Sequence, residues 1–180
     1  DPWVSAFVSQ GLACHRYFTG KYRAAARHAL RALRAAHVAR FPYAQMLSTD
    51  LRGHALLQIG QFQAGTALLE QAKSYAERLG FGMNAHAVEC SLVIYQAKFK
   101  AGPDVLRDLE SLLARRAHDS YSMRALLTEA AIQYALRGRG AEAAQARAPL
   151  LQRVTWSRAM RLVTLARRAS MRRASRSTRS

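Results

Sequence analysis

The chain has 180 residues, of which 50% are hydrophobic and 22% are charged. That composition and length allow one substantial core, which excludes a disordered chain and a disulfide-stapled miniprotein. The formal net charge is +17, and it is unevenly distributed. Residues 41–142 are almost balanced, residues 1–40 carry seven basic groups against one acid, and residues 143–180 carry ten Arg and no acid. The two ends of the chain therefore hold the charge.

The cysteine count and the hydropathy pattern indicate a cytoplasmic protein. Cys14 and Cys90 are the only cysteines, too few for a zinc site of their own or a secreted disulfide framework. The longest nearly apolar stretch, residues 87–95, is interrupted by Glu89, so we expect neither a signal peptide nor a membrane span. Because the chain begins at Asp1 rather than Met, we expect it to be part of a longer protein.

Segments rich in Ala, Leu, Arg, Glu and Gln alternate with short breaks containing Gly or Pro, which predicts consecutive antiparallel helices. The expected helices span residues 3–18, 22–39, 43–58, 62–79, 84–100, 104–117, 120–136, 140–154 and 156–173. No segment shows sustained period-two alternation, so the predicted fold class is all-α. We expect four helix pairs in residues 1–155, and a capping helix with an Arg/Ser-rich tail in residues 156–180.

An internal repeat is centred on four glycines: Gly20, Gly60, Gly102 and Gly138 lie 40, 42 and 36 residues apart. The unit around Gly60 reads Gly53, Leu56, Gly60, Phe62, Gly65, Leu69 and Ala72. The same offsets give Ala13, Arg16, Gly20, Tyr22, Ala25, Ala29 and Ala32 in the first unit, and Ala131, Tyr134, Gly138, Gly140, Ala143, Arg147 and Leu150 in the fourth. In the third unit Tyr95, Lys98, Asp104 and Arg107 replace small or apolar residues, so either the register slips there or the unit is degenerate.

Each position of this pattern has a physical purpose. A small residue late in the first helix lets the second helix approach closely. The glycine takes the positive φ that ends the first helix. The aromatic residue after it fills the notch between the helices, and the next small residue seats the second helix against the first.

This pattern resembles the tetratricopeptide repeat, with units longer than is usual for that family. Longer units with an Ala-Glu-Arg-Leu-Gly ending, as at residues 76–80, are similar to the helical repeat regions of bacterial transcriptional regulators and signalling kinases. The resemblance implies a right-handed superhelix (α-solenoid) of antiparallel helix pairs that serves as a protein-interaction module in a larger bacterial regulatory or signalling protein. A non-repeating helical bundle with glycines in its loops is the alternative fold.

Motifs for catalysis or for a cofactor do not stand out. The six histidines are scattered and form no metal-ligand set, and Cys14 points to a different face from His15. We therefore expect no enzyme activity, no metal and no cofactor, and core packing for both cysteines.

In the family that the chain resembles, the first helix of each pair lines a concave groove that binds a peptide or a partner helix. Carried over, this resemblance implies a groove lined by Gln10, Cys14, Tyr17, Asp50, His54, Leu57, Thr128 and Ile132. Asp50, Gln10 and Thr128 occupy positions where the family's carboxylate clamp has Lys, Asn and Arg, which argues against that specialised use.

The Arg-rich C-terminal end has three interpretations: a solvated tail, a phosphate contact to nucleic acid, or a phosphorylation site. A nucleic-acid contact would use Arg167, Arg168, Arg172 and Arg173, and it would weaken strongly with salt. Apolar and basic groups mix on one face of the expected last helix, which disfavours insertion into a lipid surface. The leading expectation is a module that binds a protein or peptide partner, and the alternative is a nucleic-acid-associated protein whose Arg-rich ends contact phosphates. The oligomeric state stays open.

Overall fold

The computed structural model describes residues 1–99, 104–114 and 120–149, and the regular structure in these ranges is entirely helical. The helices are α1 (Pro2–Phe18), α2 (Tyr22–Val38), α3 (Pro42–Gln58), α4 (Phe62–Arg78), α5 (Gly82–Phe99), α6 (Asp104–Ala114) and α7 (Ser120–Leu136), followed by a helical segment at 140–149. The all-α prediction is confirmed, and most predicted boundaries hold to within two residues; the predicted helix ends at residues 117 and 154 lie outside the described residues. The predicted capping helix at 156–173 lies outside the described residues.

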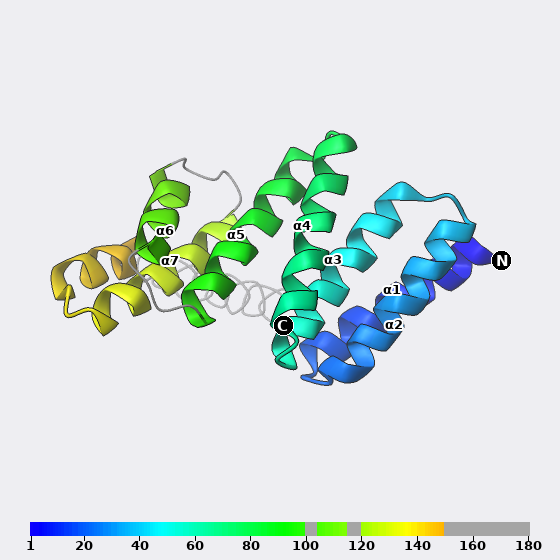
Figure 1. Ribbon diagram of the computed structural model, residues 1–180, viewed down its shortest axis with the longest axis horizontal. Helices are drawn as coiled ribbons and strands as arrows, with labels where there is room; N and C mark the ends of the chain where they lie inside the picture. The colour runs from blue at the N-terminus through cyan, green and yellow to red at the C-terminus, as the bar shows by residue number, and fades with distance from the viewer. Residues whose placement is uncertain (100–103, 115–119, 150–180) are drawn as a thin grey trace, which may run out of the picture. The chain divides into compact units, whose positions relative to one another are not determined.

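The chain divides into two compact units, residues 1–123 and 124–180. In the first unit each helix from α1 to α6 packs against the next one along the chain, and α1 also contacts α3 (Figure 1). This unit is therefore an array of consecutive helix pairs packed against their neighbours, as a helical repeat requires.

The connections between helices repeat one hydrogen-bonded turn. At the end of α3, Gly60 N donates to Leu57 O (3.1 Å) and Gln61 N donates to Leu56 O (2.9 Å), which is the Schellman pattern. The same two bonds close the connections at residues 20, 40, 80 and 138, each with a positive φ. The sequence predicts this geometry at Gly20, Gly60, Gly102 and Gly138, of which Gly102 lies outside the described residues; the structure adds Arg40 and Gly80. The turn therefore recurs every 20 residues in the first two pairs.

The two glycines Gly53 and Gly65 mark a close crossing of α3 and α4. A Cβ built on Gly65 would lie 2.6 Å from Leu57 Cγ and 3.0 Å from the Gly53 carbonyl oxygen. A Cβ on Gly53 would lie 2.9 Å from Leu69 Cδ2 and 3.1 Å from the Gly65 carbonyl oxygen. In the first pair the matching residues, Ala13 and Ala25, are both fully buried. The predicted role of the small residues is confirmed at both crossings.

Alanine dominates the core of the first unit because the helices lie close together. The stripe on α2 that faces its neighbours is Ala25, Ala29, Ala32 and Ala36, each completely buried. Successive layers of this core join α1, α2 and α3 through Ala13, Ala29 and Leu51, and then α3, α4 and α5 through Leu57, Leu69, Ala72 and Val88. Burial of these small side chains leaves the polar residues on the other faces of the helices.

One face of α1 is apolar and exposed to solvent. It presents Val4, Phe7, Val8 and Leu12, which are between 40% and 59% exposed. Forty residues later the matching positions of α3 include Ala44, which is buried against Ala36 of α2. On α3, this face is covered by α2. On α1, no described helix of the first unit covers the equivalent face.

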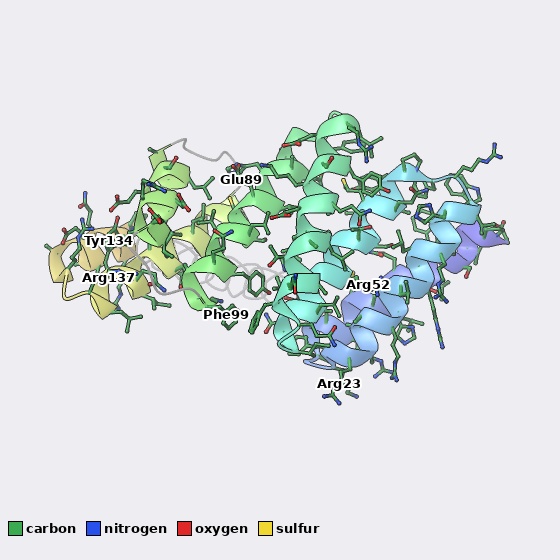
Figure 2. All side chains as sticks on the ribbon, in the orientation of Figure 1. Arg23, Arg52, Glu89, Phe99, Tyr134 and Arg137 are labelled. Atoms are coloured by element: carbon green, nitrogen blue, oxygen red, sulfur yellow. The ribbon has the colours of Figure 1, made fainter. Side chains whose placement is uncertain are left out.

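The second unit contains most of α7 and the segment 140–149. Leu126, Ala130 and Tyr134 are buried. Beside them Gln133 Nε2 donates to Glu129 Oε1 at 2.9 Å, with both side chains buried, and Arg137 donates to the Gln133 carbonyl oxygen at 3.2 Å. These pairs lie one helical turn apart along α7 (labelled at Tyr134 and Arg137 in Figure 2).

Substitution of Gly65 by Ala tests the close crossing. The added methyl group meets a backbone oxygen that cannot yield, so we expect a loss of about 2 kcal/mol in the free energy of unfolding. The matched control is Gly11→Ala on α1, where a Cβ meets nothing within 4 Å. This change should stabilise the protein by about 1 kcal/mol through helix propensity alone. Urea unfolding followed by circular dichroism measures both values, and equal effects at the two glycines would contradict the crossing.

The turn at Arg40 provides a second test. Arg40 has φ of 49°, a left-handed conformation that disfavours a side chain, so Arg40→Gly should stabilise the fold by about 1 kcal/mol. Gly20 has φ of 74° in the same turn, and Gly20→Ala should destabilise it by a similar amount because a Cβ there meets nothing within 4 Å and only the backbone is strained. If the melting temperatures of both variants shifted in the same direction, residues 20 and 40 would not share the same left-handed turn conformation.

Candidate binding site

Five polar and aromatic side chains from three helices meet in the first unit. We call them the His54 cluster: Tyr17 from α1, Asp50, His54 and Gln58 from α3, and Tyr95 from α5. Asp50, His54 and Gln58 share one face of α3 because they are four residues apart. Tyr17 and Tyr95 approach that face from the two neighbouring first helices.

His54 is the centre of this cluster. Its Nε2 lies 3.3 Å from Asp50 Oδ1, and its Nδ1 lies 3.5 Å from the Tyr95 hydroxyl. Gln58 Nε2 donates to the same hydroxyl at 2.9 Å, and the Tyr17 ring stands edge-on to the imidazole at a centroid distance of 6.2 Å. The His54 and Asp50 side chains are only 20% and 29% exposed. The cluster is therefore held in place yet partly open to solvent.

An aromatic row extends the cluster at both ends. The Tyr17 ring meets Tyr22 of α2 edge-on at 5.5 Å, and the Tyr95 ring stacks with Phe99 at 6.2 Å. Phe99 in turn meets Phe62, the first residue of α4, at 4.3 Å. Figure 2 shows Phe99 projecting from the end of α5 towards the ends of α3 and α4. Phe62 and Phe99 are 42% and 53% exposed, so this row ends on an open aromatic surface.

The environment of the cluster changes the pKa of Tyr17 and of the nearby Cys14 thiol. Burial raises the pKa of Tyr17, and hydrogen bonding to Tyr95 raises it further. Burial also raises the pKa of the Cys14 thiol, and the negative charge of Asp50 adds to this effect. Asp50 Oδ1 is itself buried and accepts no hydrogen bond from the described protein residues, because His54 lies near it without the alignment of a bond. The site can therefore accept a hydrogen bond from a ligand at this position.

The structure brings together most of the groove residues predicted on α1 and α3. Tyr17, Asp50 and His54 form the cluster, and Cys14 is half-buried close enough for its pKa to respond to Asp50. Gln10 lies further along α1, where its Oε1 accepts a hydrogen bond from Ser48 Oγ at 2.8 Å. This bond ties α1 to α3.

The prediction for Leu57 is wrong. Its side chain is 2% exposed and packs with Leu69, Ala72 and Val88 rather than facing a groove. The reason is the missing side chain of Gly65: Leu57 fills the space that a Cβ on Gly65 would occupy.

Thr128 and Ile132 belong to the second unit and are both exposed on α7. Ile132 lines a hollow of about 380 Å³ within that unit, together with Ala135, Ala143 and Arg147. The predicted phosphate contacts Arg167, Arg168, Arg172 and Arg173 lie outside the described residues.

Sequence reasoning missed Tyr95 and Gln58. The spacing from Gly102 places Tyr95 at a position for a small residue, and the predicted groove contains no residue of the third unit. The pattern that indicates an aromatic surface here is the pair Tyr95 and Phe99, two aromatic residues four apart at the end of a first helix. Gln58 was overlooked because it lies next to the turn, although it is four residues after His54.

A second polar cluster lies on α5. Cys90 Sγ is 3.3 Å from His86 Nε2, and His86 Nδ1 is 3.6 Å from Glu89 Oε2. Lys73 Nζ of α4 lies 3.9 Å from the other carboxylate oxygen, Glu89 Oε1. Cys90 is only 1% exposed, so its thiol cannot reach a substrate. Among the described residues, no three His, Cys, Asp or Glu side chains are arranged to hold a metal ion, and none of the helices is long and apolar enough to cross a membrane.

The chemistry of the His54 cluster is that of recognition. It offers two phenol hydroxyls, an amide, an imidazole and a carboxylate on a surface of aromatic rings, which together can donate and accept hydrogen bonds and stack on apolar groups. Comparisons with protein-family models, with curated proteins and with solved structures found no match to the chain. The resemblance to the tetratricopeptide repeat therefore depends on the repeat pattern and on the helix-pair architecture.

The reactivity of Cys14 tests the geometry of the site. Removing the charge of Asp50 should lower the pKa of the thiol and so increase the fraction of thiolate at pH 8. We expect Asp50→Asn to accelerate alkylation of Cys14 by iodoacetamide severalfold, measured by peptide mass mapping. Asp104→Asn, at an exposed position of α6, is the control and should leave the rate unchanged. Equal alkylation rates in Asp50→Asn and Asp104→Asn would show that the charge of Asp50 does not act on the Cys14 thiol.

Proposed function

We propose that this chain is a protein-interaction module, a right-handed superhelical array of helix pairs similar to the tetratricopeptide repeat, which holds a segment of a partner protein against the His54 cluster. The observation that carries this proposal is the meeting of Tyr17, His54 and Tyr95 on three consecutive first helices. Side chains 37 to 41 residues apart in sequence form one surface. This matches the way in which a repeat array builds a binding wall from equivalent helices.

Binding suits these residues better than catalysis. Among the described residues the imidazole contacts a carboxylate and two phenol rings, and none of its contacts is a thiol or a Ser or Thr hydroxyl that it could activate. A chain with this role would be a cytoplasmic part of a larger bacterial regulatory or signalling protein, and it would need no cofactor.

The chemistry of the cluster also indicates the kind of segment that it binds. The Asp50 carboxylate repels the carboxylate at the end of a polypeptide, so the partner presents an internal segment. The buried acceptor on Asp50 favours a segment with a hydrogen-bond donor, and the exposed rings of Phe62 and Phe99 favour an apolar side chain nearby.

A displayed library of random twelve-residue peptides provides the probe for this proposal. Peptides selected on the full chain should bind His54→Ala and Tyr95→Phe at least tenfold more weakly, measured by isothermal titration calorimetry. Their binding to His37→Ala, which removes an exposed histidine at the end of α2, should be unchanged. Circular dichroism verifies that each variant is folded. A library that yields no binder, or binders that tolerate His54→Ala, would contradict the proposed site.

A further inference from the structure

The N-terminal part of the chain has an unbalanced positive charge. Between Asp1 and Asp50 the sequence contains no acidic residue, yet it contains six Arg and one Lys. Four of these arginines lie on α2, at Arg23, Arg27, Arg31 and Arg34. Such a run has no opposite charge close in the sequence to neutralise it.

The four arginines form one line on the exposed side of α2, and we call this line the arginine ridge. They are three or four residues apart, so they share a face, and at 1.5 Å per residue the line is about 16 Å long. All four side chains are exposed, and none forms an ion pair with a described residue. Figure 2 shows Arg23 pointing away from the helices at one end of this line.

The neighbouring His28 responds to this concentration of charge. Its pKa is lowered, first by partial burial and then by the positive charges of Arg31, Arg16 and Arg27. Arg16 reaches it from α1, and the other two belong to the ridge. A cation is therefore disfavoured beside the ridge, and an anion is favoured.

Hollows in the surface lie along the ridge. Arg23 and Arg27 line one of about 380 Å³, together with Leu56, Ile59 and Gln61. Arg31 and Arg34 line another of about 690 Å³, between α1 and α2, together with Asp1, Ser5 and Ser9. The guanidinium groups can thus be approached from the side as well as from above.

We propose that the arginine ridge binds the phosphate backbone of a nucleic acid. Duplex DNA carries about one negative charge per 1.7 Å of its axis, so a 16 Å line of cations meets several phosphates at once and releases their counterions. The guanidinium fork also pairs with phosphate through two hydrogen bonds. The ridge presents only guanidinium groups, without the Asn, Gln or carboxylate side chains that would read adenine or cytosine, so the contact is mainly with the backbone and specifies little sequence.

Two other anionic surfaces fit the ridge less well. A membrane surface would need apolar side chains beside the cations, whereas Val38 is the one large apolar residue on this side of α2 that is mainly exposed. An acidic protein would need a buried anchor among the arginines, which supplies most of the energy at protein interfaces, and the ridge itself carries only charge.

The test uses the full chain and a fluorescent 20-base-pair DNA duplex of mixed sequence. In the ridge variant, Arg23, Arg27, Arg31 and Arg34 are replaced by Gln. In the matched tail variant, Arg167, Arg168, Arg172 and Arg173 are replaced by Gln, so that both lose four charges. Fluorescence anisotropy gives Kd between 50 and 200 mM salt, and circular dichroism verifies folding.

We expect the ridge variant to bind at least tenfold more weakly than the wild type, with the slope of log Kd against log salt smaller by about three to four. Replacing the same four residues by Lys should retain most of the affinity, because it keeps the charge. Bound DNA should also raise the pKa of His28, measured by proton NMR, because phosphate offsets the repulsion from Arg31, Arg16 and Arg27.

Several results would overturn the proposal. One is a ridge variant that binds DNA as the wild type does while the tail variant does not; another is a His28 pKa that is unchanged by DNA. Tighter binding to a Glu-rich peptide, or to vesicles containing phosphatidylserine, than to DNA at the same salt would assign the ridge to an acidic protein or to a membrane. None of these results depends on the peptide site at the His54 cluster.

Discussion

Contact between helices without intervening side chains is the constraint on which the first unit depends. Where α3 crosses α4, each glycine lies against a backbone oxygen of the other, and a methyl group on either would overlap a leucine. Alanines at the matching crossing of α1 and α2 are completely buried. Helices this close leave little room for large core residues, so the stability of the unit comes from many small, well-fitted contacts. Such a core tolerates change poorly, because even one methylene group is felt.

The same close packing creates the His54 cluster. When each second helix fits tightly against the first helices on both sides of it, those first helices become neighbours, as the contact between α1 and α3 demonstrates. Tyr17, His54 and Tyr95 then meet, although they are far apart in the sequence. The hydrogen bond from Ser48 to Gln10 sets the alignment of α1 with α3 at the other end of the interface. The geometry of the cluster is therefore a consequence of the core beneath it.

The fold followed from the sequence where a residue type has one physical purpose. Gly20 and Gly60 could be placed in their turns because positive φ strongly favours glycine, whereas Arg40 in the same turn gave no signal. The site was harder to predict, because a shift of one residue rotates a helical position by about 100°. Tyr17 and Leu57 occupy equivalent places, three residues before a turn, yet Tyr17 reaches the cluster and Leu57 fills the core. The difference arises from the second helix of each pair, which has Ala25 in the first pair and Gly65 at the matching position in the second. Counting along the first helix alone does not reveal it.

The arginine ridge arises from the packing of α2. The helix buries Ala25, Ala29, Ala32 and Ala36, and positions two residues earlier or later point to the opposite side, where the arginines stand. Like charges three or four residues apart on a helix repel each other by about 0.2–0.5 kcal/mol per pair, and α2 has no acidic residue to offset this. A phosphate chain laid along the ridge would offset this repulsion by its attraction to each arginine, so the fold would gain stability from its ligand. Core packing and charge thus act on opposite faces of one helix, and ligand binding on the outer face need not disturb the small-residue contacts on the inner one.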